Sequence, residues 1–286
     1  MTTQQKDIAS RVLAALESGQ TELPTLPDIA LKLRDLLQDS DVAVNRIVSL
    51  LSTDPVISMH VIRAANSAAL FRGEPVFNLH DAVLKLGNQM LHSMIMNITL
   101  NKLFQARSPL IDRTLKQLWE HSHAVAANSY VLAREQAHLR PDTAMLIGLV
   151  HGIGALPLYL YADRHYPQIE SATLDSLVGE HAAAITPRLL KNWSFPEELV
   201  EVVASQSAQK ELDGADRASY SDVLAIAVLQ ADDPEATLSR RDMLAAERLG
   251  YYAADCRNFQ PNHREQLASV KNLLRVDVAR SGKLQK

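Results

Sequence analysis

The 286-residue sequence has one cysteine, few glycines and no strong excess of charge. The lone Cys256 excludes an internal disulfide and a cysteine-based zinc site, and it suits a reducing compartment. Lys and Arg number 29 against 33 Asp and Glu, so no bulk electrostatic attraction draws the chain to nucleic acid or to an anionic membrane. The isolated basic pair Arg240-Arg241 is interpreted as a solvated helix start. The first 20 residues lack the apolar run of a signal peptide, and no membrane span is expected, which predicts a cytoplasmic protein.

Helical patterns fill nearly the whole sequence, and alternating strand patterns are hard to find. Asp54-Pro55 is typical of an N-cap followed by a first helical residue, Asn78 with Asp81 resembles a capping arrangement, and Gly87 interrupts the pattern that follows. The sequence therefore predicts an all-α fold, a compact multi-helix bundle. Helices are expected over about residues 56–69, 112–138, 143–150, 174–185, 196–205, 223–229, 243–252 and 266–274.

Pro187 lies inside a helix that should run from the region of Gly179 to Trp193. A proline ring clashes with the preceding helical turn and removes a hydrogen-bond donor. We therefore expect two shorter helices that meet near residues 185–187.

Two histidines fall on the inward faces of neighbouring predicted helices. His121 lies on the apolar stripe of the long helix, and His151 ends an apolar helix within the run of residues 146–154. His123 is about 200° further round its helix than His121 and is expected to point elsewhere. The inward pair could share a metal or a ligand, or each could be a core histidine with its own hydrogen-bond partner.

Short motifs in a fixed order carry a family resemblance. They are Leu23-Pro24-x-Leu26-Pro27, Asp54-Pro55, Ala65-Asn66-Ser67-Ala68, Ala82-Val83-x-x-Leu86-Gly87 and Trp193-x-x-Pro196. This set resembles the HDOD domain, the regulatory and non-catalytic branch of the HD superfamily of metal-dependent phosphohydrolases. The similarity runs from about residue 20 to 210.

The resemblance implies three parts of the chain. Residues 1–19 form an N-terminal helix, and residues 20–210 form the HDOD domain. That domain has a helical subdomain at 20–108 and an HD-like core at 109–210. Residues 211–286 form C-terminal helices packed on the core.

Residues that a working HD site needs are missing here. His121 and His151 match two of the family's ligand positions. The other family positions, including its aspartate and its lysine, are occupied by Gly152, Ala155, Ala182, Gln206 and Ser207. His181 is one residue from Ala182, which turns a helical side chain by about 100°, so it is not counted as a ligand. Two neutral imidazoles without a carboxylate cannot neutralise a divalent ion. We expect a vestigial pocket at His121 and His151, with no catalytic residue, no metal and no cofactor.

Asn66-Ser67 has two interpretations. The two side chains can cap the end of a helix, or they can form a recognition surface for a partner protein or a small signalling molecule. Capping is the favoured interpretation. Trp119 and Trp193 are expected to anchor the core, with each ring nitrogen bound to a carbonyl.

By resemblance, the expected function is regulatory: a bacterial signal-transduction protein that contacts signalling proteins in trans and is a possible homodimer. No nucleic acid or membrane is expected as a partner. Two alternatives remain open. The chain could be a metal-dependent phosphohydrolase with a reduced ligand set, or it could be a sensor that uses the old pocket for a nucleotide or another small molecule.

Overall fold

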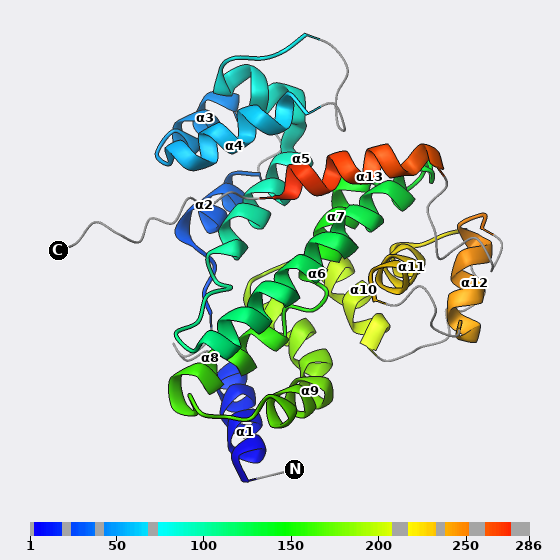
Figure 1. The fold of residues 1–286 in the computed structure, drawn as a ribbon. Helices are drawn as coiled ribbons and strands as arrows, with labels where there is room; N and C mark the ends of the chain where they lie inside the picture. Colours follow the sequence, from blue (N-terminus) through cyan, green and yellow to red (C-terminus); the bar gives the residue numbers. More distant parts are fainter. Residues whose placement is uncertain are drawn as a thin grey trace.

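The computed structural model describes residues 3–18, 24–37, 43–67, 74–207, 217–232, 238–251 and 261–275. Within these ranges the chain forms thirteen helices and no strand, which confirms the all-α prediction (Figure 1). Cys256, Leu23, Ala68 and most of the C-terminal tail lie outside them. The helices are α1 (Thr3–Ser18), α2 (Asp28–Leu37), α3 (Val44–Leu51), α4 (Pro55–Ala65), α5 (Leu79–Asn101), α6 (Pro109–Arg134), α7 (Pro141–Val150), α8 (Ala155–His165), α9 (Ser171–Asn192), α10 (Glu197–Ser207), α11 (Tyr220–Asp232), α12 (Arg240–Arg248) and α13 (Pro261–Leu274).

Local capping signals locate two helix starts correctly. The Asp54 carboxylate accepts hydrogen bonds from the backbone N–H groups of Val56 and Ile57 at 2.9 and 3.2 Å, and Pro55 is the first helical residue. The Asn78 side chain accepts from the Asp81 N–H at 2.8 Å. These bonds satisfy amides that the first helical turn leaves without partners.

Gly87 kinks α5, as the interrupted pattern predicts. Its φ of 71° lies in the left-handed region, which a residue with a Cβ rarely adopts. The kink changes the direction of α5, so that this one long helix contacts two different groups of helices. α2, α3 and α4 pack on α5, and α5 in turn packs on α7 (Figure 1).

The expected break at Pro187 is wrong, because α9 runs without interruption from Ser171 to Asn192 with the proline inside it. The lost bond is the one that a residue 187 N–H would donate to the Ala183 carbonyl. Ala183 is exposed, so its carbonyl can accept from water instead. On the buried side, Ile185 and Leu189 still pack into the core and hold the helix in place.

Two glycines allow the central helices to approach at backbone distance. A Cβ placed on Gly148 of α7 would stand 2.7 Å from the Ala126 Cα of α6. A Cβ on Gly154, just before α8, would stand 2.3 Å from the Ala182 carbonyl oxygen and 2.5 Å from the Thr186 nitrogen of α9. The Gly154 N–H also donates to the Thr186 hydroxyl at 3.1 Å. Only glycine fits at these two contacts.

The C-terminal helices pack on the centre of the molecule. α11 and α13 both lie against α6, and α12 packs on α11 (Figure 1). The Asn128 amide of α6 donates to the Ala227 carbonyl at 3.1 Å, and the Asn97 amide of α5 donates to the Leu274 carbonyl at 2.9 Å. A buried ion pair, Arg248 with Asp222 at 3.0 Å, joins α12 to α11.

One segment in the described part of the chain, Pro141–His165, is long and apolar enough to cross a membrane, although the sequence led us to expect none. In its most apolar stretch, 78% of the residues are buried inside the protein. The segment comprises α7 and α8 with a turn between them. Its composition is therefore accounted for by its place in the core.

The close contacts at Gly154 give a testable prediction for the free energy of unfolding. Gly179 is the control, because the same substitution there should have the opposite effect. Gly154→Ala should lower the free energy of unfolding by about 2 kcal/mol or more, because the new methyl group meets backbone atoms that cannot move away. Gly179→Ala, where nothing lies within 4 Å of the added carbon, should raise it by roughly 0.5–1 kcal/mol through helix propensity. Urea unfolding of both variants measures the pair, and equal effects would contradict the close packing at Gly154.

Candidate functional site

The structure brings His121 and His151 together. Their ring centroids lie 5.3 Å apart, one ring projecting from the middle of α6 and the other from the C-terminus of α7. The His121 Nδ1 also lies 3.4 Å from a carboxylate oxygen of Asp232, at the end of α11. Sequence reasoning missed Asp232, because its position depends on how α11 packs against α6 rather than on any local motif.

His151 is held as a neutral imidazole. Its Nδ1 lies 2.7 Å from the Gly148 carbonyl, which can only accept, so Nδ1 carries the proton and Nε2 keeps its lone pair. Burial lowers the pKa of His151 to about 4; the bond to Gly148 opposes this shift and the neighbouring His121 adds to it. The ring is therefore uncharged at neutral pH.

Gly152 leaves open space beside this imidazole. A Cβ built there would meet only the Leu118 Cδ1, at an ordinary 3.7 Å. A side chain could therefore begin at this position without a clash at its Cβ, yet the sequence supplies none. Ala155, where the family carries lysine, is the first residue of α8 and is buried.

The next family position shows the same loss. Ala182 lies in α9, and its carbonyl accepts a hydrogen bond from the Thr186 hydroxyl at 2.9 Å. The adjacent His181 is half-buried, and its Nε2 is buried without a hydrogen-bond partner among the described residues. Among the described residues, no ring contact joins His181 to His121 or to His151.

Gln206 and Ser207 occupy the positions where the family has its last histidine pair. An arginine binds the backbone there. Arg241 donates from Nη1 to the carbonyls of Ser205 and Gln206 at 3.3 and 3.1 Å, and so caps the C-terminus of α10. Its Nε and Nη2 and the Gln206 Oε1 are buried without partners in the described structure. Burial lowers the pKa of Arg241. The expectation of a solvated pair is therefore wrong for Arg241, although α12 does begin at Arg240. Ser207 ends α10, and its side chain lies outside the described residues.

These residues do not fit a divalent metal. Among the described residues, no group of three His, Cys, Asp or Glu side chains is placed to hold a metal ion. Asp232 faces the Nδ1 of His121, and Gly152 leaves the doublet position without an oxygen donor. Hydrolytic metal sites need carboxylate and imidazole ligands that together offset the ion's charge. No hydrolytic step is derived through such a group.

The motif residues outside the pocket make architectural contacts. The Asn66 side chain forms two hydrogen bonds with the backbone of Val76, donating to its carbonyl at 2.7 Å and accepting from its N–H at 2.8 Å. Ser67 follows Asn66, and its N–H donates to the Ala64 carbonyl at 3.0 Å, beyond the end of α4. The pair thus ties the end of α4 to the segment that leads into α5.

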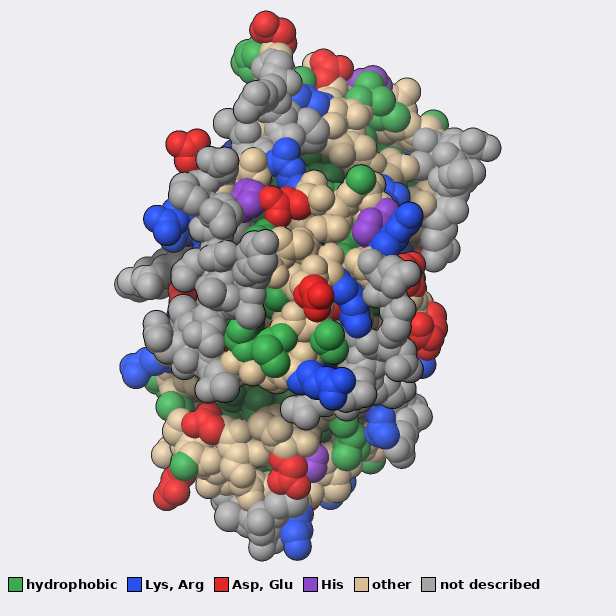
Figure 2. Space-filling model, turned by 90° about the vertical axis from the view of Figure 1, so that its right-hand side faces the viewer, with side chains coloured by type: hydrophobic (Ala, Val, Ile, Leu, Met, Phe, Trp, Pro, Cys, Tyr) green, Lys and Arg blue, Asp and Glu red, His purple; other side chains and the backbone are tan. Residues whose placement is uncertain are grey.

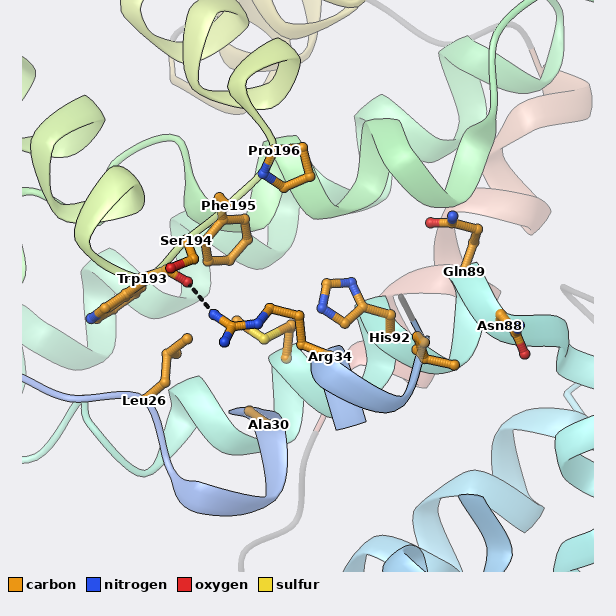
Figure 3. Close-up of a pocket in the computed structure, with 12 residues that line it drawn as sticks. Leu26, Ala30, Arg34, Asn88, Gln89, His92, Trp193, Ser194, Phe195 and Pro196 are labelled. Atoms are coloured by element: carbon orange, nitrogen blue, oxygen red, sulfur yellow. Dashed lines mark hydrogen bonds between the residues drawn. The ribbon is translucent and has the colours of Figure 1, made fainter. Parts of the chain in front are cut away.

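Trp193 and Pro196 form the connection between α9 and α10. The Trp193 ring nitrogen donates to the Pro24 carbonyl at 3.0 Å, and the Trp193 carbonyl accepts from Arg34 Nη1 at 2.8 Å (Figure 3). The Pro196 carbonyl accepts from the N–H groups of Leu199 and Val200 at the start of α10. This connection therefore joins the segment around α2 to the second half of the domain.

The low pKa of His151 predicts a pH-dependent stability. Between about pH 6.5 and 4 the unfolded chain binds a proton at this residue that the folded chain does not. The contribution of His151 to the free energy of unfolding should therefore be complete above pH 6.5. It should fall as the pH drops, by up to about 1.4 kcal/mol per pH unit. His151→Gln should flatten the slope. His123 also has a pKa lowered to about 4, by burial and then by Arg275, so some slope should remain.

Urea titrations at several pH values measure this slope. An unchanged slope in a folded His151→Gln variant would show that His151 is not buried as a neutral ring.

Comparison with known proteins supports the fold and the family. The HDOD domain model matches residues 23–209. A crystal structure from Shewanella amazonensis SB2B, of a protein named as a candidate metal-dependent phosphohydrolase, superposes with a TM-score of 0.81 at 25% identity and covers 96% of this chain and 100% of that one. An HDOD domain protein of unknown function from Geobacter sulfurreducens gives a TM-score of 0.64 at 22% identity, covering 94% of this chain and 97% of the other.

An uncharacterized protein of Treponema pallidum (strain Nichols) is 23% identical over 209 residues. The match covers 68% of this chain but only 39% of that longer protein. Since the family model spans well over half of the sequence and the helices superpose on an HDOD structure, the chain belongs to the HDOD domain family.

Proposed function

We propose that this protein is a regulatory signal-transduction domain that works by binding other signalling proteins and carries out no hydrolysis. The observation that carries the proposal is Gly152, which supplies no side chain next to His151, where a metal-bridging carboxylate would be needed. Family membership supports the regulatory part, because the HDOD branch resembles HD enzymes in fold and lacks their complete ligand set. Ala182 in α9 and Gln206 in α10 also stand at positions where the family has metal ligands.

Exposed apolar side chains support binding to a protein. Large apolar residues usually lie inside, and an exposed group of them is typical of an interaction site. Phe77 is 83% exposed and Met59 is 59% exposed, and Val56 and Leu84 are also on the surface of α4 and α5. Ser52, Ser58 and Leu79 line a hollow next to Met59. We propose this surface, defined by Val56, Met59, Phe77 and Leu84, as the contact for a signalling protein in trans.

The charges disfavour nucleic acid as that partner. The net charge of the chain is -4, and on the face in Figure 2 the described Lys and Arg side chains are scattered among acidic ones. Phosphate backbones bind best to a continuous basic surface.

A residual phosphohydrolase is the second candidate. It is favoured by one observation, the Asp232 carboxylate 3.4 Å from His121, which supplies a donor that the sequence motifs did not reveal. A single carboxylate with two imidazoles remains short of the ligand sets of working sites.

Restoration of the missing ligands tests the proposal against that candidate. The double variant Gly152→Asp, Ala182→His should bind Mn²⁺ tightly enough to be retained on a desalting column, whereas wild type should not retain it. Gly152→Asn with Ala182→His is the control, because the amide has the same size without the charge. Elemental analysis and a screen of phosphoesters measure both properties. Stoichiometric metal in wild type, with turnover that is lost in His151→Ala, would overturn the non-catalytic proposal.

Charge substitution on the apolar surface tests the partner contact. Met59→Glu with Phe77→Glu should abolish capture of a partner from a native cell extract and leave the melting temperature unchanged within a few degrees, since both side chains are exposed. Met243→Glu, at an apolar position of α12 that is 46% exposed, is the control and should retain the partner. Sedimentation of wild type and the double variant shows whether the partner is a second copy of the chain. Equal capture by all three proteins would contradict this surface.

A further inference from the structure

A cavity of about 240 Å³ lies between α2, α5 and the α9–α10 connection, away from the histidine pair (Figure 3). Three segments distant in sequence supply its walls. α2 and the residues before it contribute Leu26, Ala30, Arg34 and Leu37, and α5 contributes Asn88, Gln89, His92 and Met96. Trp193, Ser194, Phe195 and Pro196 complete it.

Arg34 places one positive charge at this cavity. Its Nη1 donates to the Trp193 carbonyl, and its Nε and Nη2 donate to a carboxylate oxygen of Asp35 at 3.1 and 2.9 Å. A guanidinium has five N–H donors, so these bonds leave donors on Nη1 and Nη2 for a ligand. The Asp35 side chain is 63% exposed, so water screens its charge, and a ligand carboxylate would compete with it for the guanidinium.

The other polar groups at the cavity are neutral. The His92 ring points toward Arg34 in Figure 3, and burial followed by the charge of Arg34 lowers the pKa of His92. The ring can therefore donate one hydrogen bond and accept another. Asn88 and Gln89 add amides at the exposed rim. No Asp or Glu is among the described lining residues, and Asp35, which is bonded to Arg34, lies outside that lining.

The rest of the lining is apolar and partly aromatic. Trp193 and Phe195 are buried, with ring centroids 6.5 Å apart, and Met96 lies on the opposite helix. Ser194 lies between Trp193 and Phe195 in the sequence. Its φ of 55° is a left-handed conformation that is costly for a residue other than glycine. The connection is thus held in a strained form, with the Phe195 ring on the side of Arg34 and His92 and the Trp193 ring turned toward Pro24 (Figure 3).

We propose that this cavity binds a small aromatic carboxylate. The carboxylate would pair with the remaining N–H donors of Arg34 in charge-assisted hydrogen bonds, and the ring would lie against the apolar walls. The volume is below the roughly 300–1,000 Å³ of pockets for drug-sized ligands, so the ligand has a single ring and a nucleotide does not fit. Because α2 and α5 meet the α9–α10 connection here, the ligand would link the two halves of the domain.

Phenylacetate and its neutral isostere phenylacetamide are the probes. Calorimetric titration of wild type should give saturable one-site binding of phenylacetate, and phenylacetamide should bind at least tenfold more weakly because it lacks the charge. Arg34→Gln should weaken phenylacetate at least tenfold. Arg113→Gln, which removes an exposed arginine from α6, is the matched control and should bind as wild type does.

Arg34→Gln also removes the bond to the Trp193 carbonyl, so a second variant leaves that contact intact. Gln89→Phe fills the cavity from an exposed position and should abolish binding with the fold preserved in circular dichroism. The proposal is overturned by no binding of phenylacetate to wild type at millimolar concentration, by equal binding of the amide, or by binding that survives Gln89→Phe. None of these results depends on whether the protein has a signalling partner or a metal.

Discussion

The backbone contact between α6 and α7 is the constraint on which the centre of the molecule depends. At Gly148 the two helices are so close that a single added carbon would stand 2.7 Å from the Ala126 Cα. His151 follows Gly148 by less than one turn and bonds back to its carbonyl, so the same contact fixes the position and the tautomer of that ring. Gly154 makes a similarly close backbone contact with α9. The frame of an HD-type site is therefore set by glycines and backbone contacts, and it persists when ligand side chains are absent.

Charge balance, rather than the absence of histidines, decides what this site can do. A neutral imidazole with a free Nε2, as in His151, is the form that binds a metal. Burial that lowers its pKa even favours that form. Two neutral imidazoles would offset none of the charge of a divalent ion placed there, and the Asp232 carboxylate faces the Nδ1 of His121. Under the proposed function, Gly152 is thus the position that matters most, because a carboxylate there would supply the missing negative charge.

Features that arise within one or two helical turns could be predicted from the sequence, and features set by packing between distant segments could not. The caps at Asp54 and Asn78 and the kink at Gly87 follow from local chemistry. Pro187 misled the prediction because its cost depends on whether the Ala183 carbonyl reaches water, which only the packed helix decides. Asp232 and Arg241 come to the site from helices beyond residue 210, and no spacing rule connects them to His121 or Gln206.

One direct hydrogen bond joins two segments that carry family ligand positions, and two others attach α12 and α2 to the same region. The Gly154 N–H bonds to Thr186 of α9, Arg241 binds the last carbonyls of α10, and Arg34 binds the carbonyl of Trp193 between those two helices. An ion that bridges helices stabilises a fold by binding the folded state alone. Where protein groups already make these connections, a metal site can lose its ligands without loss of the fold. The Arg34 guanidinium, which lines the cavity between α2 and α5, is itself part of this network of connections.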